Sequence, residues 1–163
     1  MTQSMWITKA SISKRLAKVT TCFYFEIDSR LNSRIVAASI DAPSSSVYLF
    51  ASNPANMPQW APAFVKSIAH VNGEWIIDSN LGKVKIKFAP ANPFGVLDHV
   101  ITLPDGRALN NPMRVVSNGA GSLVTFTLFR QEGMSDAEFE RDAAMVESDL
   151  QALKRAVEAL PLE

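Results

Sequence analysis

The chain has 163 residues, of which 47% are apolar and 20% charged, as expected for a single globular domain. Its 16 lysines and arginines balance 16 aspartates and glutamates. Zero net charge argues against nucleic-acid binding as the main role, because neutralising phosphates needs an excess of basic groups. No apolar run reaches about 18 residues, so we expect no membrane-spanning segment. A single cysteine, Cys22, excludes an intrachain disulfide.

Charge divides the chain near Ser33. Residues 1–34 hold six basic and two acidic groups, whereas the remainder holds ten basic and fourteen acidic groups. We therefore predict an N-terminal extension over 1–33 and a folded domain over 34–163. Three interpretations of the extension stay open: a loosely ordered segment or early start codon, an additional packed helix or strand, and a targeting or membrane-surface segment. The extension lacks the apolar core of a secretory signal, and we expect a cytoplasmic protein.

The first predicted elements are one strand and two short helices. Residues 35–40 are apolar and end at Asp41-Ala42-Pro43, a pattern that predicts a strand running into a helix start. Residues 47–51 provide the apolar part of the first helix. Asn53-Pro54 ends it, and residues 56–61 predict a second short helix that stops before Pro62.

Six further strands are predicted, joined by short turns. Asn72-Gly73 is a tight hairpin turn, and residues 83–88 alternate lysines with apolar side chains, as in a half-buried antiparallel strand. The strand near Pro112 is expected to be broken there. The predicted strands are 64–71, 74–78, 83–88, 95–103, 108–117 and 122–130.

The C-terminal segment predicts a long amphipathic helix of about 25 residues that ends before Pro161. Ser135 and Glu138 form a capping-box pattern. Apolar residues then follow at steps of three and four, which places them on one face. That stripe consists of Phe139, Ala143, Val146, Leu150, Leu153, Val157 and Leu160.

This element order predicts an α+β fold. Short connections favour a mainly antiparallel sheet of seven strands, and the apolar stripe of the helix needs one face of that sheet to cover. A twisted sheet of this size curls around a single helix. Where the curl is wider than the helix, side chains fill the space or a cavity remains.

The order resembles the helix-grip fold of the START-like, or SRPBCC, superfamily, which includes pollen-allergen-like proteins and the polyketide cyclase/dehydrase and lipid-transport group. Local strings such as SIDAPSSSVYLFASNPANMPQW and NGEWIIDSNLGKVKIKF are similar to that group. Similar strings lie at 39–60, 72–88, 95–101, 113–130 and 134–158. The resemblance covers about residues 34–160 and implies a hydrophobic small-molecule ligand, lipid-like or polyketide-like, without implying a reaction.

His99 is the candidate for chemistry. Side chains alternate along a strand, so His99 shares a face with Leu97 and Ile101, whereas Asp98 points to the opposite face. An inward imidazole in an apolar wall is suited to orienting a polar group or to moving a proton. The alternative is a buried histidine whose hydrogen bonds are satisfied by neighbouring backbone. Asp98 is expected to pair with a lysine or arginine on the outer face.

Five further residues are candidate ligand contacts. Arg114 would bind a carboxylate or phosphate if it pointed inward. Trp60, at the end of the second short helix, and Trp75, after the first hairpin turn, have the area and the N–H donor of a pocket wall. Phe126 and Met145 are candidates too, although the pattern favours ordinary core packing for both.

No motif in the sequence requires a cofactor or metal. Two histidines and one cysteine, widely separated, do not form a zinc-ligand pattern, and phosphate-binding glycine loops are missing. The leading hypothesis is therefore binding of a hydrophobic small molecule between the sheet and the C-terminal helix. The alternatives are a cyclase or aromatase that uses His99 for proton transfer, and a regulatory or interaction module with a filled interior. The oligomeric state stays open.

Overall fold

The computed structural model describes residues 31–161. The predictions made for the extension over 1–33 concern residues that lie almost wholly outside this range, and they stay predictions. Ser33–Glu163 forms one compact unit, which is the subject here.

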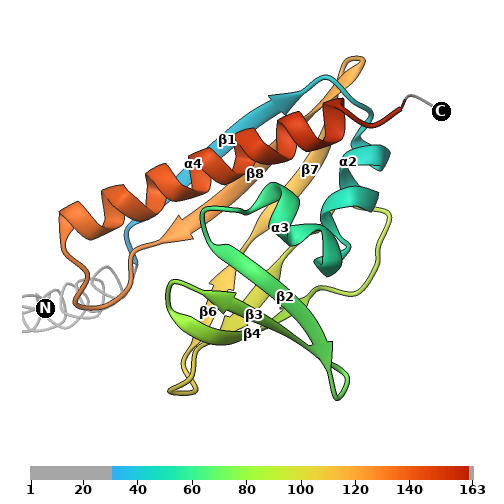
Figure 1. The fold of residues 1–163 in the computed structure, drawn as a ribbon. Helices are drawn as coiled ribbons and strands as arrows, with labels where there is room; N and C mark the ends of the chain where they lie inside the picture. The colour runs from blue at the N-terminus through green and yellow to red at the C-terminus, as the bar shows by residue number, and fades with distance from the viewer. Residues whose placement is uncertain (1–30, 162–163) are drawn as a thin grey trace, which may run out of the picture. The chain divides into compact units, whose positions relative to one another are not determined.

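Eight strands, three α-helices and a 3₁₀ turn follow one another along residues 31–161 (Figure 1). Pro43 occupies the N-cap position, one residue before the first helical turn in which we expected it. In chain order the elements are β1 (Ser33–Ile40), α2 (Ser44–Ala51), η1 (Pro54–Asn56), α3 (Met57–Trp60), β2 (Val65–Val71), β3 (Glu74–Ser79), β4 (Gly82–Phe88), β5 (His99–Thr102), β6 (Ala108–Asn111), β7 (Met113–Asn118), β8 (Gly121–Phe129) and α4 (Asp136–Glu158).

The strands form two antiparallel sheets, so the prediction of one seven-stranded sheet was wrong. One sheet has the order β1-β8-β7 and the other β2-β3-β4-β5-β6. The division falls at Pro112, which has no N–H to donate and ends β6 before β7 begins. Two backbone hydrogen bonds of 2.9 Å hold the loop before β5 against β7, from Val115 N to Gly95 O and from Leu97 N to Met113 O.

Strand β5 is shorter than predicted, because residues 95–98 leave the ladder. Gly95 has a φ of +68°, a conformation that breaks a regular strand. The side chain of Asn92 accepts hydrogen bonds from the N–H groups of Phe94 and Val96 and holds this segment as a turn. Val96 then bridges to Arg114 of β7 instead of continuing along β4. The loop therefore connects the two sheets.

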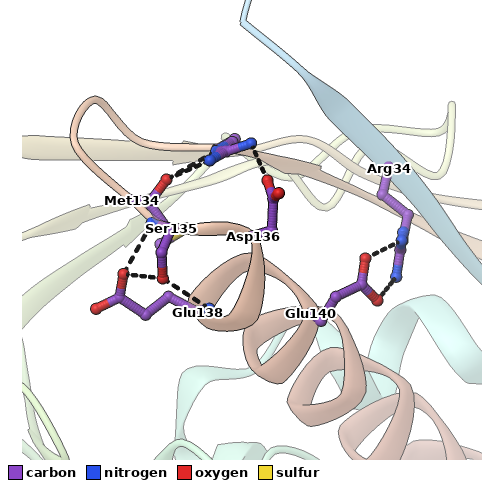
Figure 2. A network of polar contacts seen from close by, with 7 residues as sticks. Arg34, Met134, Ser135, Asp136, Glu138 and Glu140 are labelled. Carbon is purple, nitrogen blue, oxygen red and sulfur yellow. Dashed lines mark hydrogen bonds and ion pairs between the residues drawn. The ribbon is translucent and has the colours of Figure 1, made fainter.

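The capping box predicted for the long helix is present. The Ser135 hydroxyl accepts a hydrogen bond from Glu138 N–H, and the Glu138 carboxylate accepts from Ser135 N–H at 2.8 Å. Figure 2 shows this box beside an ion pair of 2.5 Å between Arg34 of β1 and Glu140 of α4. The capping box thus stabilises the first turn of α4, and the ion pair holds that end of the helix against β1.

Helix α4 packs along β1 and β8, and α2 and α3 also contact it (Figure 1). Its buried apolar residues, including Leu150, Leu153 and Val157, join the inward side chains of both sheets in one core. Leu160, predicted as the last member of the stripe, follows the helix and is 41% exposed. Within the part of the chain described, no helix combines the length and apolarity needed to cross a bilayer.

Candidate functional site

A pocket of about 190 Å³ lies where α3 and α4 face the sheets. Its walls are mainly apolar and come from elements far apart in sequence. Apolar wall residues include Met57, Phe64, Ile101, Leu128, Val146 and Leu150. Apart from Phe64, which lies in the link between α3 and β2, each belongs to a helix or strand that turns a hydrophobic side inward. The pocket is therefore a place where the inner faces of the helices and sheets do not close completely.

Four of the six predicted contact residues line this pocket: Trp60, His99, Phe126 and Met145. Trp60 is the last residue of α3, and Met145 lies two turns into α4. His99 and Phe126 project from β5 and β8, with their rings 5.9 Å apart. The structure therefore gathers these side chains from two helices and both sheets.

The other two predicted residues lie elsewhere. The Arg114 side chain pairs with Asp98, as expected of an outward arginine on this strand, and its carboxylate-binding role in a pocket has no geometric support. Trp75 is half-buried on β3, where its ring lies tilted against the ring of His70, with the two ring centroids 4.8 Å apart. The tryptophan lies across the first hairpin from His70 and is not a wall residue of the pocket.

The Asp98–Arg114 pair has a structural role at the junction of the sheets. Asp98 also accepts a hydrogen bond of 2.9 Å from Met113 N. Although burial acts to raise it, these hydrogen bonds hold the pKa of the Asp98 carboxyl below its usual range. The predicted outward pairing of Asp98 is confirmed, and the carboxylate helps to fix β7 beside the end of β5.

His99 is 5% exposed and its ring stands between Phe88 and Phe126. Its Nδ1 lies 3.0 Å from the carbonyl oxygen of Leu97, so that nitrogen carries the proton and Nε2 is a hydrogen-bond acceptor. Burial lowers the pKa of the imidazole, against the effect of the Leu97 hydrogen bond, and His99 is neutral at physiological pH. Among residues 31–161, no group donates a hydrogen bond to Nε2.

Two acidic wall residues, Asp142 and Asp149 on α4, were not predicted. Asp149 is only 7% exposed and accepts a hydrogen bond of 2.9 Å from Ala63 N, in the link between α3 and β2. Burial raises the pKa of the Asp149 carboxyl to about 6, and it also raises the pKa of Asp142. Neither carboxylate forms an ion pair with another described residue.

The helical spacing of the sequence already placed both acids on the apolar face of the C-terminal helix. Asp142 follows Phe139 by three residues and Asp149 precedes Leu153 by four, so each belongs to the apolar stripe. An acid in such a stripe is costly to bury and is a signal of a polar function.

The indole N–H of Trp60 is a buried donor with no acceptor among the described residues. A buried donor without a partner costs roughly 1–3 kcal/mol, which proteins seldom tolerate without reason. Trp60 is 3% exposed, and its N–H is closed off from the open space of the pocket.

Among residues 31–161, no three histidine, cysteine, aspartate or glutamate side chains gather as a metal site.

Comparison with solved structures places the architecture among known folds. The protein XoxI from Bacillus cereus superposes with a TM-score of 0.64 at 16% identity, covering 82% of this chain and all of the other. Ara h 8.0201 gives 0.62 at 13% identity, covering 80% of this chain and 100% of its own. A START superfamily protein from Mycobacterium smegmatis gives 0.58 at 15% identity, with coverages of 79% and 99%.

No protein-family model and no curated protein matched the sequence. The structural likenesses confirm the START-like fold expected from the element order. At these identities they establish the fold alone, so function has to be argued from the pocket.

Proposed function

We propose that this protein binds a hydrophobic small molecule in the pocket between its sheets and α4. The observation that carries the proposal is the pocket itself, whose apolar walls are interrupted by a few convergent polar groups, His99 and Asp149 among them. Ligand sites commonly have this composition, with area from the apolar side chains and orientation from the polar ones. Each Å² of apolar surface removed from water would contribute about 25 cal/mol.

The size of the pocket limits the ligand. An engineered apolar cavity of about 150 Å³ in another protein accommodates benzene, and the pocket here measures about 190 Å³. A ligand of one or two rings with a short substituent matches this space. A long acyl chain would need the walls to move apart.

The proposal is tested by narrowing the pocket. Replacing Val146, a half-buried wall residue of α4, by phenylalanine adds a ring where the ligand would lie. Val116→Phe is a matched control, because Val116 is exposed on β7 and lines no part of the pocket. Binding of the neutral two-ring dye 6-propionyl-2-(dimethylamino)naphthalene, followed by fluorescence, should weaken in the first variant and not in the second. Equal dye binding by both variants contradicts the proposal.

A second candidate function is an enzyme in which His99 transfers a proton. The observation in its favour is the neutral imidazole in the pocket wall, with Nδ1 held by Leu97 and Nε2 without a partner among the described residues. Such a nitrogen is a competent base, although its lowered pKa makes it a weak one. Full turnover of a discovered substrate by a His99→Gln variant would exclude this role.

Native mass spectrometry of freshly purified full-length protein separates these functions from a filled interaction module. A reproducible bound mass of one- or two-ring size supports binding. A protein that never carries a bound small molecule and does not bind the neutral dye favours the regulatory or interaction module with a filled interior.

A further inference from the structure

The walls of the pocket carry charge of only one sign. Asp142 and Asp149 both line it, and no lysine or arginine among the described residues does. Neither acid has a cationic partner within residues 31–161. A buried carboxylate without a counter-charge is unfavourable unless something else supplies one. The two carboxylates of the pocket therefore have no positively charged partner among the described residues, and a cationic ligand would supply one.

Asp149 is the better placed of the two acids. It is 7% exposed, whereas Asp142 is half-buried and has Arg141 close enough to favour its charge. The acids are seven residues apart, which corresponds to about 10 Å along the helix axis, so one small cation does not reach both. Only one oxygen of Asp149, Oδ1, is engaged, by Ala63 N–H. The second oxygen accepts from no described donor.

His99 adds an independent observation that points to the same kind of ligand. Its ring is 5% exposed and lines the pocket, and Nε2 is an acceptor without a donor among the described residues. A neutral imidazole here repels no cation and accepts an N–H or O–H hydrogen bond. The unpaired donor in the wall, Trp60 N–H, is closed off from the open space, so it does not set the charge of the ligand.

The aromatic walls suit a cation as well as a ring. Trp60, Phe64 and Phe126 all line the pocket. The faces of aromatic rings attract ammonium groups, more strongly when water is excluded. Apolar area for the body of the ligand and acceptors for a positive end therefore occur together.

We propose that the ligand is a small aromatic amine, whose protonated nitrogen pairs with Asp149 and whose ring packs between α3, α4 and β8. This inference rests on the proposed binding function and names the chemical class of its ligand. The ammonium group supplies the missing counter-charge, and its remaining hydrogens have the His99 Nε2 acceptor in the same pocket. An anionic ligand of the same shape would add a third negative charge beside two carboxylates.

The test compares three ligands that share one shape and differ in charge. These probes are 2-(1-naphthyl)ethylamine, 2-(1-naphthyl)ethanol and 1-naphthylacetate, titrated into the full chain by isothermal calorimetry. At about pH 7.5 the amine is protonated, as a lysine side chain is. Since a hydrogen bond to a charged group is stronger than a neutral one, we expect the amine to bind roughly ten- to a hundredfold more tightly than the alcohol. The acetate should bind most weakly.

Two variants test whether the Asp149 carboxylate causes the preference for the amine over the alcohol. Asp149→Asn keeps an oxygen for Ala63 N–H and removes the charge, so amine binding should fall much more than alcohol binding, and the preference for the amine should be lost. Glu147→Gln removes an exposed charge from the same helix and should change neither. Retained alcohol binding by the Asp149 variant shows that the pocket is intact.

The possible failures are distinguishable. If the alcohol binds but the amine gains nothing, or the acetate binds best, the amine class is refuted and the binding function stands. An amine preference that survives Asp149→Asn refutes the assignment to Asp149. If none of the three probes binds, the proposed binding function is refuted and the charge preference with it.

Discussion

Removing the buried charge of Asp149 should stabilise the protein at neutral pH. Burial raises the pKa of this carboxyl from 3.8 to about 6, so the folded state holds the proton more tightly than the unfolded chain does. The carboxyl's favourable contribution is therefore fully present below the unfolded pKa and is lost as the pH rises through the folded one. One pKa unit corresponds to about 1.4 kcal/mol, so the shift destabilises the fold above about pH 7 by at most about 3 kcal/mol.

Asp149→Asn isolates this effect, because the asparagine oxygen can still accept from Ala63 N–H. Urea unfolding of both proteins between about pH 4.5 and 7.5 gives the difference in unfolding free energy at each pH, in which the other titrating groups cancel. That difference should grow in favour of the variant as the pH rises, and it should level off above the folded pKa.

The control is Glu147→Gln, which removes an exposed carboxylate of the same helix. Its difference from the unmodified protein should stay within about 0.5 kcal/mol across the range, as is usual for surface substitutions. A constant difference for Asp149→Asn would refute the reasoning, since a carboxyl with an ordinary pKa gives no such slope. Higher stability combined with lost amine binding would show that this acid serves the ligand at the expense of the fold.

Three further outcomes follow from the structure, each measured by urea unfolding. Gly95→Ala should destabilise the fold by more than about 2 kcal/mol, because a Cβ there would clash with the Val115 carbonyl oxygen and the residue has a positive φ. A stability equal to that of the unmodified chain would contradict this placement. Ser135→Ala should cost about 1 kcal/mol through loss of the helix cap, and an unchanged value would mean that the cap contributes nothing. Arg114→Ala should lower the unfolding free energy by less than about 1 kcal/mol, since the ion pair of Arg114 with Asp98 is partly exposed. Dye binding should not change, and weakened dye binding would show that Arg114 contributes to the ligand site.

Local patterns predicted the elements well where one physical cause dominates. The capping box and the three–four spacing placed α4, and the Asn72-Gly73 turn placed the first hairpin. The alternation around His99 also predicted correctly that the imidazole faces inward and Asp98 outward. In each case, the neighbours that decide the conformation are close in sequence.

Errors arose where distant segments decide the outcome. The bend at Pro112 was recognised, but whether a bent strand continues one sheet or divides two depends on the partners it meets across the bend. The separation of Arg114 from the pocket likewise depends on the position of Asp98, which the turn at Gly95 sets. The two acids on α4 were missed because apolar side chains alone define the stripe, and a carboxylate within it looks like a solvent-facing residue until the elements packed against it are known.

The pairing of β1 with β8 has a consequence for how the chain reaches this structure. Ser33 lies opposite Phe129, and Ile40 opposite Ser122, so the ladder joins segments more than 80 residues apart. Contacts between distant segments slow folding, because closing a long loop costs entropy before any contact repays it. On a ribosome, the hairpins from β2 to β6 can assemble early, whereas β1 waits for β8 and α4 to emerge. Until then, the inward side of β1 remains exposed to other nascent chains, and this is the stage at which a chaperone would matter most.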